Sequence, residues 1–327
     1  MSDIKLFRLT AGKASELQGD TADLEKPLQT LIEANLQPLL NIRFLASEYT
    51  TGKTHGGRID SLGLDENHCP VILEYKRSVG ENVINQGLFY LNWLMDHQAE
   101  FKLLVLQRLG VSSAEAIDWS APRVVCIASD FTKYDDHAVQ QIGRNIELIR
   151  YRRFGNELLL LEQANSSSSG NASRHGKSTP SKDNKATYPH ANTSINLSAT
   201  NTKPGSDKSY AEVVSTLSTP LSELLTSTED YLLSLGDDVQ RKELKLYSAF
   251  KRLKNFATLV PQKNRLLLFL HLAPCDWVAK LSNARDMSQQ GHWGTGDVEV
   301  ALATQADLDA AKAAILAAYE GKPVSVP

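Results

Sequence analysis

Residues 56–77 read GGRIDSLGLDENHCPVILEYKR, and this stretch predicts a hairpin with charged groups on both arms. Asp60 lies on the first arm, and Glu74, Tyr75 and Lys76 lie on the second. Successive side chains of a strand point to opposite faces, so Glu74 and Lys76 share one face. Two carboxylates on neighbouring strands suit a divalent cation such as Mg²⁺, which prefers oxygen ligands. The hairpin therefore predicts a metal site with an ammonium group beside it.

Each of these residues also has an ordinary structural interpretation. A lone Glu-x-Lys pattern is common, and Glu74 and Lys76 would fit a surface ion pair worth about 0–1 kcal/mol. Asp60 would fit a residue close to a turn. The hairpin alone does not decide between these interpretations and catalysis.

The segments on either side of the hairpin favour the catalytic interpretation. Residues 21–40 have helical periodicity, and Glu33 lies beside the apolar stripe. Residues 81–97 predict a second helix, in which Gln86 and Tyr90 are four residues apart and share a face. Glu33, Gln86 and Tyr90 would separately fit ordinary helix positions. A helix with Glu, a hairpin with Asp and Glu-x-Lys, and a helix with Gln-x-x-x-Tyr are harder to obtain by chance in that order.

Over residues 21 to about 110, this ordered set resembles the PD-(D/E)XK nuclease superfamily, most closely its NucS- and RecB-like branch. The resemblance implies an α/β fold, a restriction-endonuclease-like mixed sheet flanked by helices. It also implies Mg²⁺ or Mn²⁺ as cofactor, held by three carboxylates: Asp60, Glu74 and Glu33. Lys76 would be the catalytic lysine, and Gln86 and Tyr90 would orient active-site groups and approach the DNA backbone. Ile59 precedes Asp60 where the superfamily nominally has proline, a departure usual in this branch.

Other charged residues lie close to the hairpin. Arg58 and Arg77 flank the predicted site and are candidate phosphate contacts, although arginines are solvated by default. Glu48 is a further acidic candidate just before the hairpin, with no role assigned to it.

Composition sets outer limits on the function. The chain has 327 residues, 42% of them hydrophobic, and a formal net charge of −3, so binding to DNA would depend on local basic patches. The spacing of Cys69, Cys126 and Cys275 supports neither a disulfide framework nor a zinc site. Without a signal-peptide pattern or an apolar run long enough to span a bilayer, we expect a cytoplasmic protein that does not enter membranes.

A change of composition divides the chain into three parts. We expect a nuclease-like domain over 1–163, a flexible linker rich in Ser, Asn, Thr and Lys over 164–209, and a smaller α+β domain of unknown role over 210–327. Within the first domain the patterns predict a strand in IKLFRL, strands over 101–109 and 123–131, a helix over 133–143 and a hairpin over 146–162.

The C-terminal part carries basic and aromatic residues together. Residues 231–256 are predicted to be mostly helical, with Lys251 and Arg252 as candidate nucleic-acid contacts. An amphipathic helix with a solvated lysine face is the alternative. A strand is expected over 265–272, and Thr304 with Asp307 predicts a capping box that opens a helix ending at Gly321. This part resembles an uncharacterised domain of bacterial proteins labelled "predicted transport protein", a label that nothing in the sequence supports.

Taken together, the sequence predicts a metal-dependent deoxyribonuclease, more specifically an endonuclease, that acts in DNA repair, restriction or defence. A homodimer would supply two active sites for cutting two strands, although no interface can be read from the sequence. The alternative is a non-catalytic module that binds nucleic acid or a partner with the same fold.

Overall fold

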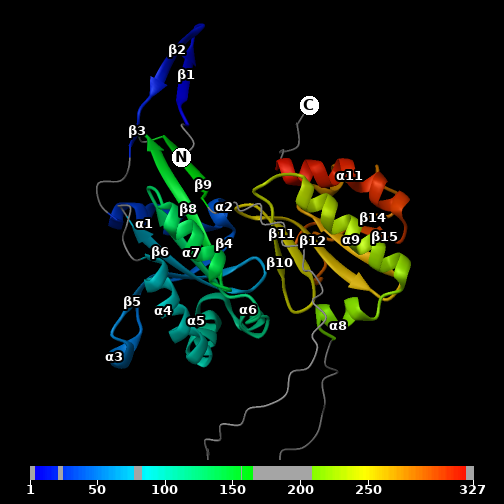
Figure 1. The fold of residues 1–327 in the computed structure, drawn as a ribbon, viewed down its shortest axis with the longest axis horizontal. Helices are drawn as coiled ribbons and strands as arrows, with labels where there is room; N and C mark the ends of the chain where they lie inside the picture. Colours follow the sequence, from blue (N-terminus) through cyan, green and yellow to red (C-terminus); the bar gives the residue numbers. More distant parts are fainter. Residues whose placement is uncertain (1–3, 21–24, 77–82, 156, 165–207, 322–327) are drawn as a thin grey trace, which may run out of the picture.

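Two units lie side by side in the structure, a computed structural model (Figure 1). It describes residues 4–20, 25–76, 83–155, 157–164 and 208–321. The last strand of the first unit is β9 (Leu158–Gln163), and the second unit begins with α8 (Tyr210–Ser215). Most of the expected linker, residues 165–207, lies outside the described residues.

The N-terminal unit is built on a seven-stranded mixed sheet within the described chain. Its strand order is β3-β8-β7-β6-β5-β4, and β9 also pairs with β8. β6, β7 and β8 are parallel to one another, whereas the other pairs are antiparallel. The strands are β3 (Gly19–Asp20), β4 (Ile42–Thr50), β5 (Arg58–Asp65), β6 (Pro70–Lys76), β7 (Arg123–Ala128), β8 (Asn145–Phe154) and β9 (Leu158–Gln163).

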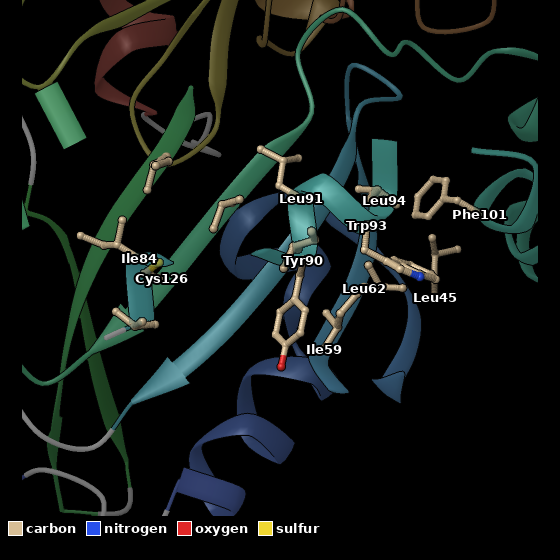
Figure 2. Packing of buried hydrophobic residues seen from close by; sticks show 14 of the residues in the cluster. Leu45, Ile59, Leu62, Ile84, Tyr90, Leu91, Trp93, Leu94, Phe101 and Cys126 are labelled. Atoms are coloured by element: carbon tan, nitrogen blue, oxygen red, sulfur yellow. The ribbon is translucent and has the colours of Figure 1, made fainter. Parts of the chain in front are cut away.

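Helices cover both faces of this sheet. The side chains of α1 (Glu25–Ala34) and α2 (Leu36–Leu40) pack in a core with Leu73 and Tyr75 of β6. Those of α4 (Val83–Asp96) and α5 (Gln98–Leu109) pack on the other face with residues of β4, β5 and β7. Figure 2 shows part of this second core, including Leu45, Ile59, Leu62, Tyr90, Leu91, Trp93, Leu94 and Phe101.

The central strands are almost continuously apolar, as expected for parallel strands buried on both faces. All six residues of β7 are buried, and so are all residues of β6 except Lys76. A charged residue inside such a strand is unusual. In β6 that residue is Glu74, which is buried, whereas the other charged residue, Lys76, lies at the end of the strand.

Smaller elements complete the unit. β1 (Leu6–Thr10) and β2 (Lys13–Leu17) form a separate hairpin, so the strand expected in IKLFRL exists but lies outside the main sheet. The helix expected over 133–143 is α7 (Lys133–Gln141), which begins with a capping box. Two short helices are α3 (Gly52–His55) and α6 (Val111–Glu115).

The C-terminal unit is a six-stranded antiparallel sheet in the order β10-β11-β12-β13-β15-β14, counted over the described residues. Side chains of α9 (Thr219–Ser234) and α11 (Gln305–Glu320) share a core with this sheet. The strands are β10 (Gln240–Glu243), β11 (Ser248–Lys251), β12 (Asn255–Gln262), β13 (Arg265–Leu270), β14 (Ala284–Asp286) and β15 (Val298–Leu302). The short helix α10 (Pro274–Trp277) precedes β14. The capping box of Thr304 and Asp307 and the left-handed Gly321 bound α11 as expected.

The expected mixed sheet flanked by helices, followed by a smaller α+β domain, is thus confirmed, but two element predictions are wrong. Residues 101–109 belong to the helix α5. Phe101 and Val105 are buried four residues apart while Leu103 and Leu106 are exposed, a helical spacing that a short apolar run does not reveal by itself. Residues 231–256 are not mostly helical, because α9 ends at Ser234 and the chain continues into β10 and β11.

Candidate active site in the β5–β6 hairpin

Asp60 and Glu74 face each other across the β5–β6 hairpin. The register pairs Ser61 with Leu73, so the next step along the ladder brings the two acidic residues together. The backbone N–H of Asp60 donates to Glu74 Oε1 at 3.3 Å, and the backbone N–H of Tyr75 donates to Asp60 Oδ2 at 3.0 Å. Each carboxylate is therefore oriented by the backbone of the strand opposite.

Both carboxyl groups are held in an environment that disfavours their negative charge. Glu74 is fully buried, and burial together with the neighbouring Asp60 raises its pKa to about 9. Burial likewise raises the pKa of Asp60, while the ammonium of Lys76 opposes the rise. Glu74 Oε2 is buried and accepts no hydrogen bond within the described structure. A cation placed between the two carboxylates would compensate the loss of solvation of both.

The donor set fits a hard divalent cation, with a limit. The described residues contain no group of three or more His, Cys, Asp or Glu arranged to hold a metal ion. The pair Asp60 and Glu74 would thus supply two oxygen ligands, and water or substrate would complete the shell. That is the usual arrangement for Mg²⁺, which keeps several of its waters.

Lys76 lies close to this pair, as the strand alternation predicts. It favours the charged forms of both Asp60 and Glu74 by its positive charge. Its Nζ is also 3.9 Å from Glu25 Oε2, at the start of α1. The ammonium therefore sits among carboxylates at the end of β6.

The carboxylate of Glu33 is engaged by Ser61 and Gln29 in this structure, and its role as a metal ligand stays a prediction. Its Oε1 accepts hydrogen bonds from Ser61 Oγ at 2.6 Å and from Gln29 Nε2 at 2.9 Å. Ser61 follows Asp60 in β5, so its side chain leaves the opposite face of the sheet, where Ser61 Oγ is 3.2 Å from Tyr75 Oη. Glu33 is consequently a partner of Ser61 and Gln29, and the same Gln29 amide also donates to the backbone carbonyl of Asp60 at 2.8 Å.

Two other acidic residues act on the site. Glu48 and Glu25 both raise the pKa of Asp60. Glu48 has a left-handed backbone, with φ of 52°, and its carboxylate binds Lys26 at 2.7 Å and Arg58 at 2.6 Å. Sequence patterns do not single out Glu25, because it lies on the same helix as Glu33 and the local sequence does not specify which side of that helix faces the site. The only signal for it was its place in the first turn.

The Gln-x-x-x-Tyr pair supports the beginning of β5. Tyr90 Oη accepts hydrogen bonds from Gln86 Nε2 at 3.3 Å and from the backbone N–H of Arg58 at 3.2 Å. A Cβ on Gly57 would lie 2.5 Å from Tyr90 Cε1, so only glycine allows this approach. Two residues before Asp60, the strand is thus fixed by α4.

The predicted nucleic-acid contacts have different outcomes. The Arg58 side chain is 69% exposed beside the site, although it pairs with Glu48. Arg77 lies outside the described residues. Arg252 is partly exposed, binds Asp238 and has its guanidinium over the ring of Tyr319.

The assignment of Lys251 to nucleic acid is wrong for this conformation. Its side chain is 2% exposed, and its ammonium donates to both carboxylate oxygens of Glu147 at 3.0 Å. A lysine engaged in this way cannot contact a phosphate. The cause is the wrong helix prediction over 231–256, which placed Lys251 on a solvated helix face rather than at the end of β11.

Comparisons with known proteins cover both units. Residues 211–322 match a family model described as "Domain of unknown function (DUF5655)", which coincides with the C-terminal unit. An uncharacterized protein of Haemophilus influenzae is 28% identical over 310 residues, which cover 91% of this chain and 94% of that protein. These matches name no activity.

Two solved structures align with part of the chain. One, titled as a complex of EndoMS with dsDNA, is 17% identical, with a TM-score of 0.22, over 40% of this chain and 48% of that one. The other, a repair endonuclease from Pyrococcus abyssi, is 15% identical, with a TM-score of 0.22, over 41% and 50%. This chain spans about half the length of each. Similarity this weak does not assign a superfamily or a function to this chain, and the resemblance to PD-(D/E)XK nucleases remains a prediction from the sequence.

Proposed function

We propose that the protein is a Mg²⁺- or Mn²⁺-dependent nuclease that hydrolyses phosphodiester bonds of DNA. The observation that carries this proposal is the pairing of Asp60 with the fully buried Glu74, whose Oε2 accepts no hydrogen bond within the described structure. Leaving a buried carboxyl oxygen without a partner costs about 1–3 kcal/mol, and such a cost in a native fold calls for an explanation. A bound cation would provide one.

The two carboxylates and the lysine would have separate roles in the reaction. Asp60 and Glu74 would hold the ion in the orientation set by the backbone N–H groups of Tyr75 and Asp60. The bound ion supplies Lewis-acid charge to the phosphate. Lys76 would neutralise the negative charge that grows on the phosphate oxygens as water attacks phosphorus and the P–O ester bond breaks.

Other residues would serve position and access. Tyr90 and Gln86 keep the start of β5 against α4, and Arg58 lies exposed beside the site to contact a phosphate. We extend the proposal to a role in DNA repair, restriction or defence, which the resemblance of the sequence supports. An endonuclease acting as a homodimer is part of the same proposal.

The test is a comparison of metal binding and cleavage in matched variants. Asp60→Asn should lose Mn²⁺ binding by calorimetry and lose cleavage of linear single- and double-stranded DNA. Lys76→Met should keep Mn²⁺ binding and lose cleavage. The controls are Asp309→Asn and Lys312→Met, an exposed ion pair on α11. If wild-type protein binds no Mn²⁺ and cuts neither substrate, the same fold acts as a non-catalytic module that binds nucleic acid or a partner.

A further inference from the structure

The turn of the β5–β6 hairpin is enclosed by the C-terminal domain. Asn67, in this turn, accepts hydrogen bonds at its Oδ1 from Tyr247 Oη at 3.1 Å and from Asn255 Nδ2 at 2.8 Å. The backbone N–H of Asn255 donates to Glu66 Oε1 at 3.0 Å. Two adjacent turn residues are thus bound by side chain and backbone groups of the other domain.

A buried group of four charges lies beneath the same turn. Asp65 at the end of β5 binds Arg123 at 2.9 Å, and Arg123 binds Glu147 through two nitrogens at 3.0 and 2.8 Å. Lys251 from the C-terminal domain completes the group on Glu147. The exposed fraction of each of the four side chains is below 5%. Asp65 Oδ1 also accepts the backbone N–H groups of Asn67 and Cys69, which links the charges to the turn.

Charge balance in this group depends on the C-terminal domain. Asp65, Glu147 and the neighbouring Glu66 face Arg123 from the N-terminal domain, and Lys251 and Lys242 from the C-terminal domain. Burial acts to raise the pKa of Glu147, but the charges of Arg123, Lys251 and Lys242 outweigh burial and hold the pKa well below its usual range. Removal of one partner from a buried ion pair is strongly destabilising, because it leaves an uncompensated charge.

Apolar contacts seal the same region. Cys69, which follows the turn, is 1% exposed and packs in one cluster with Leu244 and Ala249 of the C-terminal domain. The Cys69 thiol can reach solvent reagents only when the two domains separate here. It is therefore a built-in reporter of docking.

We propose that the C-terminal domain, whose family has no assigned function, is a positioning domain that clamps the hairpin turn and thereby holds Asp60 and Glu74 in register. The ladder from the pair Leu64 and Pro70 to the pair Ser61 and Leu73 connects the clamped end to the acidic end. Five residues of extended strand separate Asp65 from Asp60, a span of about 16 Å. The consequence for catalysis rests on the proposed function, whereas the clamp itself does not.

The experiment uses the full chain and needs no cleavage. Lys251→Met removes the ammonium that donates to both oxygens of Glu147 and keeps a side chain of similar length, and Lys312→Met is the matched control in the same domain. We expect the labelling of Cys69 by a maleimide, followed by peptide mass spectrometry, to accelerate about 100-fold or more in Lys251→Met, because a buried ion pair is broken. Cys126, buried in the N-terminal core, should label as slowly as in wild type, and exposed Cys275 equally fast in all variants.

A double variant separates the clamp from a general loss of folding. Lys251→Met with Glu147→Gln removes one cation and one carboxylate together, so the net charge of the buried group, Glu66 and Lys242 included, stays as in wild type. This restored balance should return the labelling rate most of the way to the wild-type value, whereas independent damage would make the double variant worse than either single one.

Hydrogen exchange tests the positioning step. In Lys251→Met, the amides of Asp60 and Tyr75, which donate to the two carboxylates, should exchange faster, with α5 unchanged. Unchanged Cys69 labelling in Lys251→Met would overturn the clamp. Faster labelling with unchanged exchange at Asp60 and Tyr75 would overturn the positioning role. Both results are independent of whether the protein cuts DNA.

Discussion

Replacing Glu74 with glutamine should make the stability of the metal-free protein less dependent on pH. An acid whose pKa is higher in the folded chain than in the unfolded chain binds its proton more tightly on folding. Its contribution to stability is therefore complete below the unfolded value, 4.5, and is lost as the pH rises toward the folded value, about 9. Glutamine resembles the protonated carboxyl group and carries no such dependence.

The size of the effect follows from the pKa and the burial. Glu74 is fully buried, so no solvent screening reduces it. Each pH unit inside the window corresponds to about 1.4 kcal/mol of unfolding free energy, or about 4 kcal/mol between about pH 5 and about pH 8. Wild type should lose roughly this much stability relative to Glu74→Gln over that range.

The assay is urea unfolding followed by tryptophan fluorescence, in EDTA, at several pH values. Asp309→Asn, an exposed carboxyl on α11, serves as the control and should follow wild type. Parallel pH profiles for wild type and Glu74→Gln would refute the reasoning, because they would mean that Glu74 is ionised in the fold at neutral pH.

Three further predictions concern the same domain. Binding of Mg²⁺ to wild type near neutral pH should release about one proton, seen as a dependence of the calorimetric enthalpy on the buffer, and Glu74→Gln should release none. Gly57→Ala should destabilise the protein by about 1–3 kcal/mol in urea unfolding, because the added Cβ would clash with Tyr90. The control Gly143→Ala, whose Cβ would point into open space, should cost much less. Equal costs for the two variants would contradict the contact with Tyr90. Phe101→Ala should cost about 3–5 kcal/mol in the same assay and Leu103→Ala little, a contrast that a strand at this position would not produce.

Much of the fold could be predicted from the sequence, because several segments have one dominant pattern. The hairpin was recognisable from its polar turn and the apolar run VILEY, and the helix after Thr304 from its capping box. The run FKLLVL fits a strand or a buried helix, and only packing against the sheet selects the helix. The segment after Ser234 was misread because Tyr247 and Phe250 also fit helical spacing, whereas pairing of β11 with β10 and β12 makes it a strand.

The site was predictable to the extent that strand alternation decides it. Alternation places Glu74 and Lys76 on one face, because it depends only on position along a strand, and the register of the hairpin brings Asp60 opposite Glu74. The contribution of Glu33 depended on the rotation of α1 against the sheet, which local sequence does not specify. The burial of Lys251 depended on the docking of a domain more than 100 residues away in the chain, as its partner Glu147 shows.

The central claim is that Asp60 and Glu74 form the metal site of a nuclease. The most direct measurement is single-turnover cleavage of a closed circular duplex with Mg²⁺, before and after EDTA, by wild type, Glu74→Gln and Asp309→Asn. We expect nicking or linearisation by wild type and Asp309→Asn that EDTA abolishes, and no cutting by Glu74→Gln. Cleavage that persists in EDTA, or an equal rate in Glu74→Gln, would contradict it.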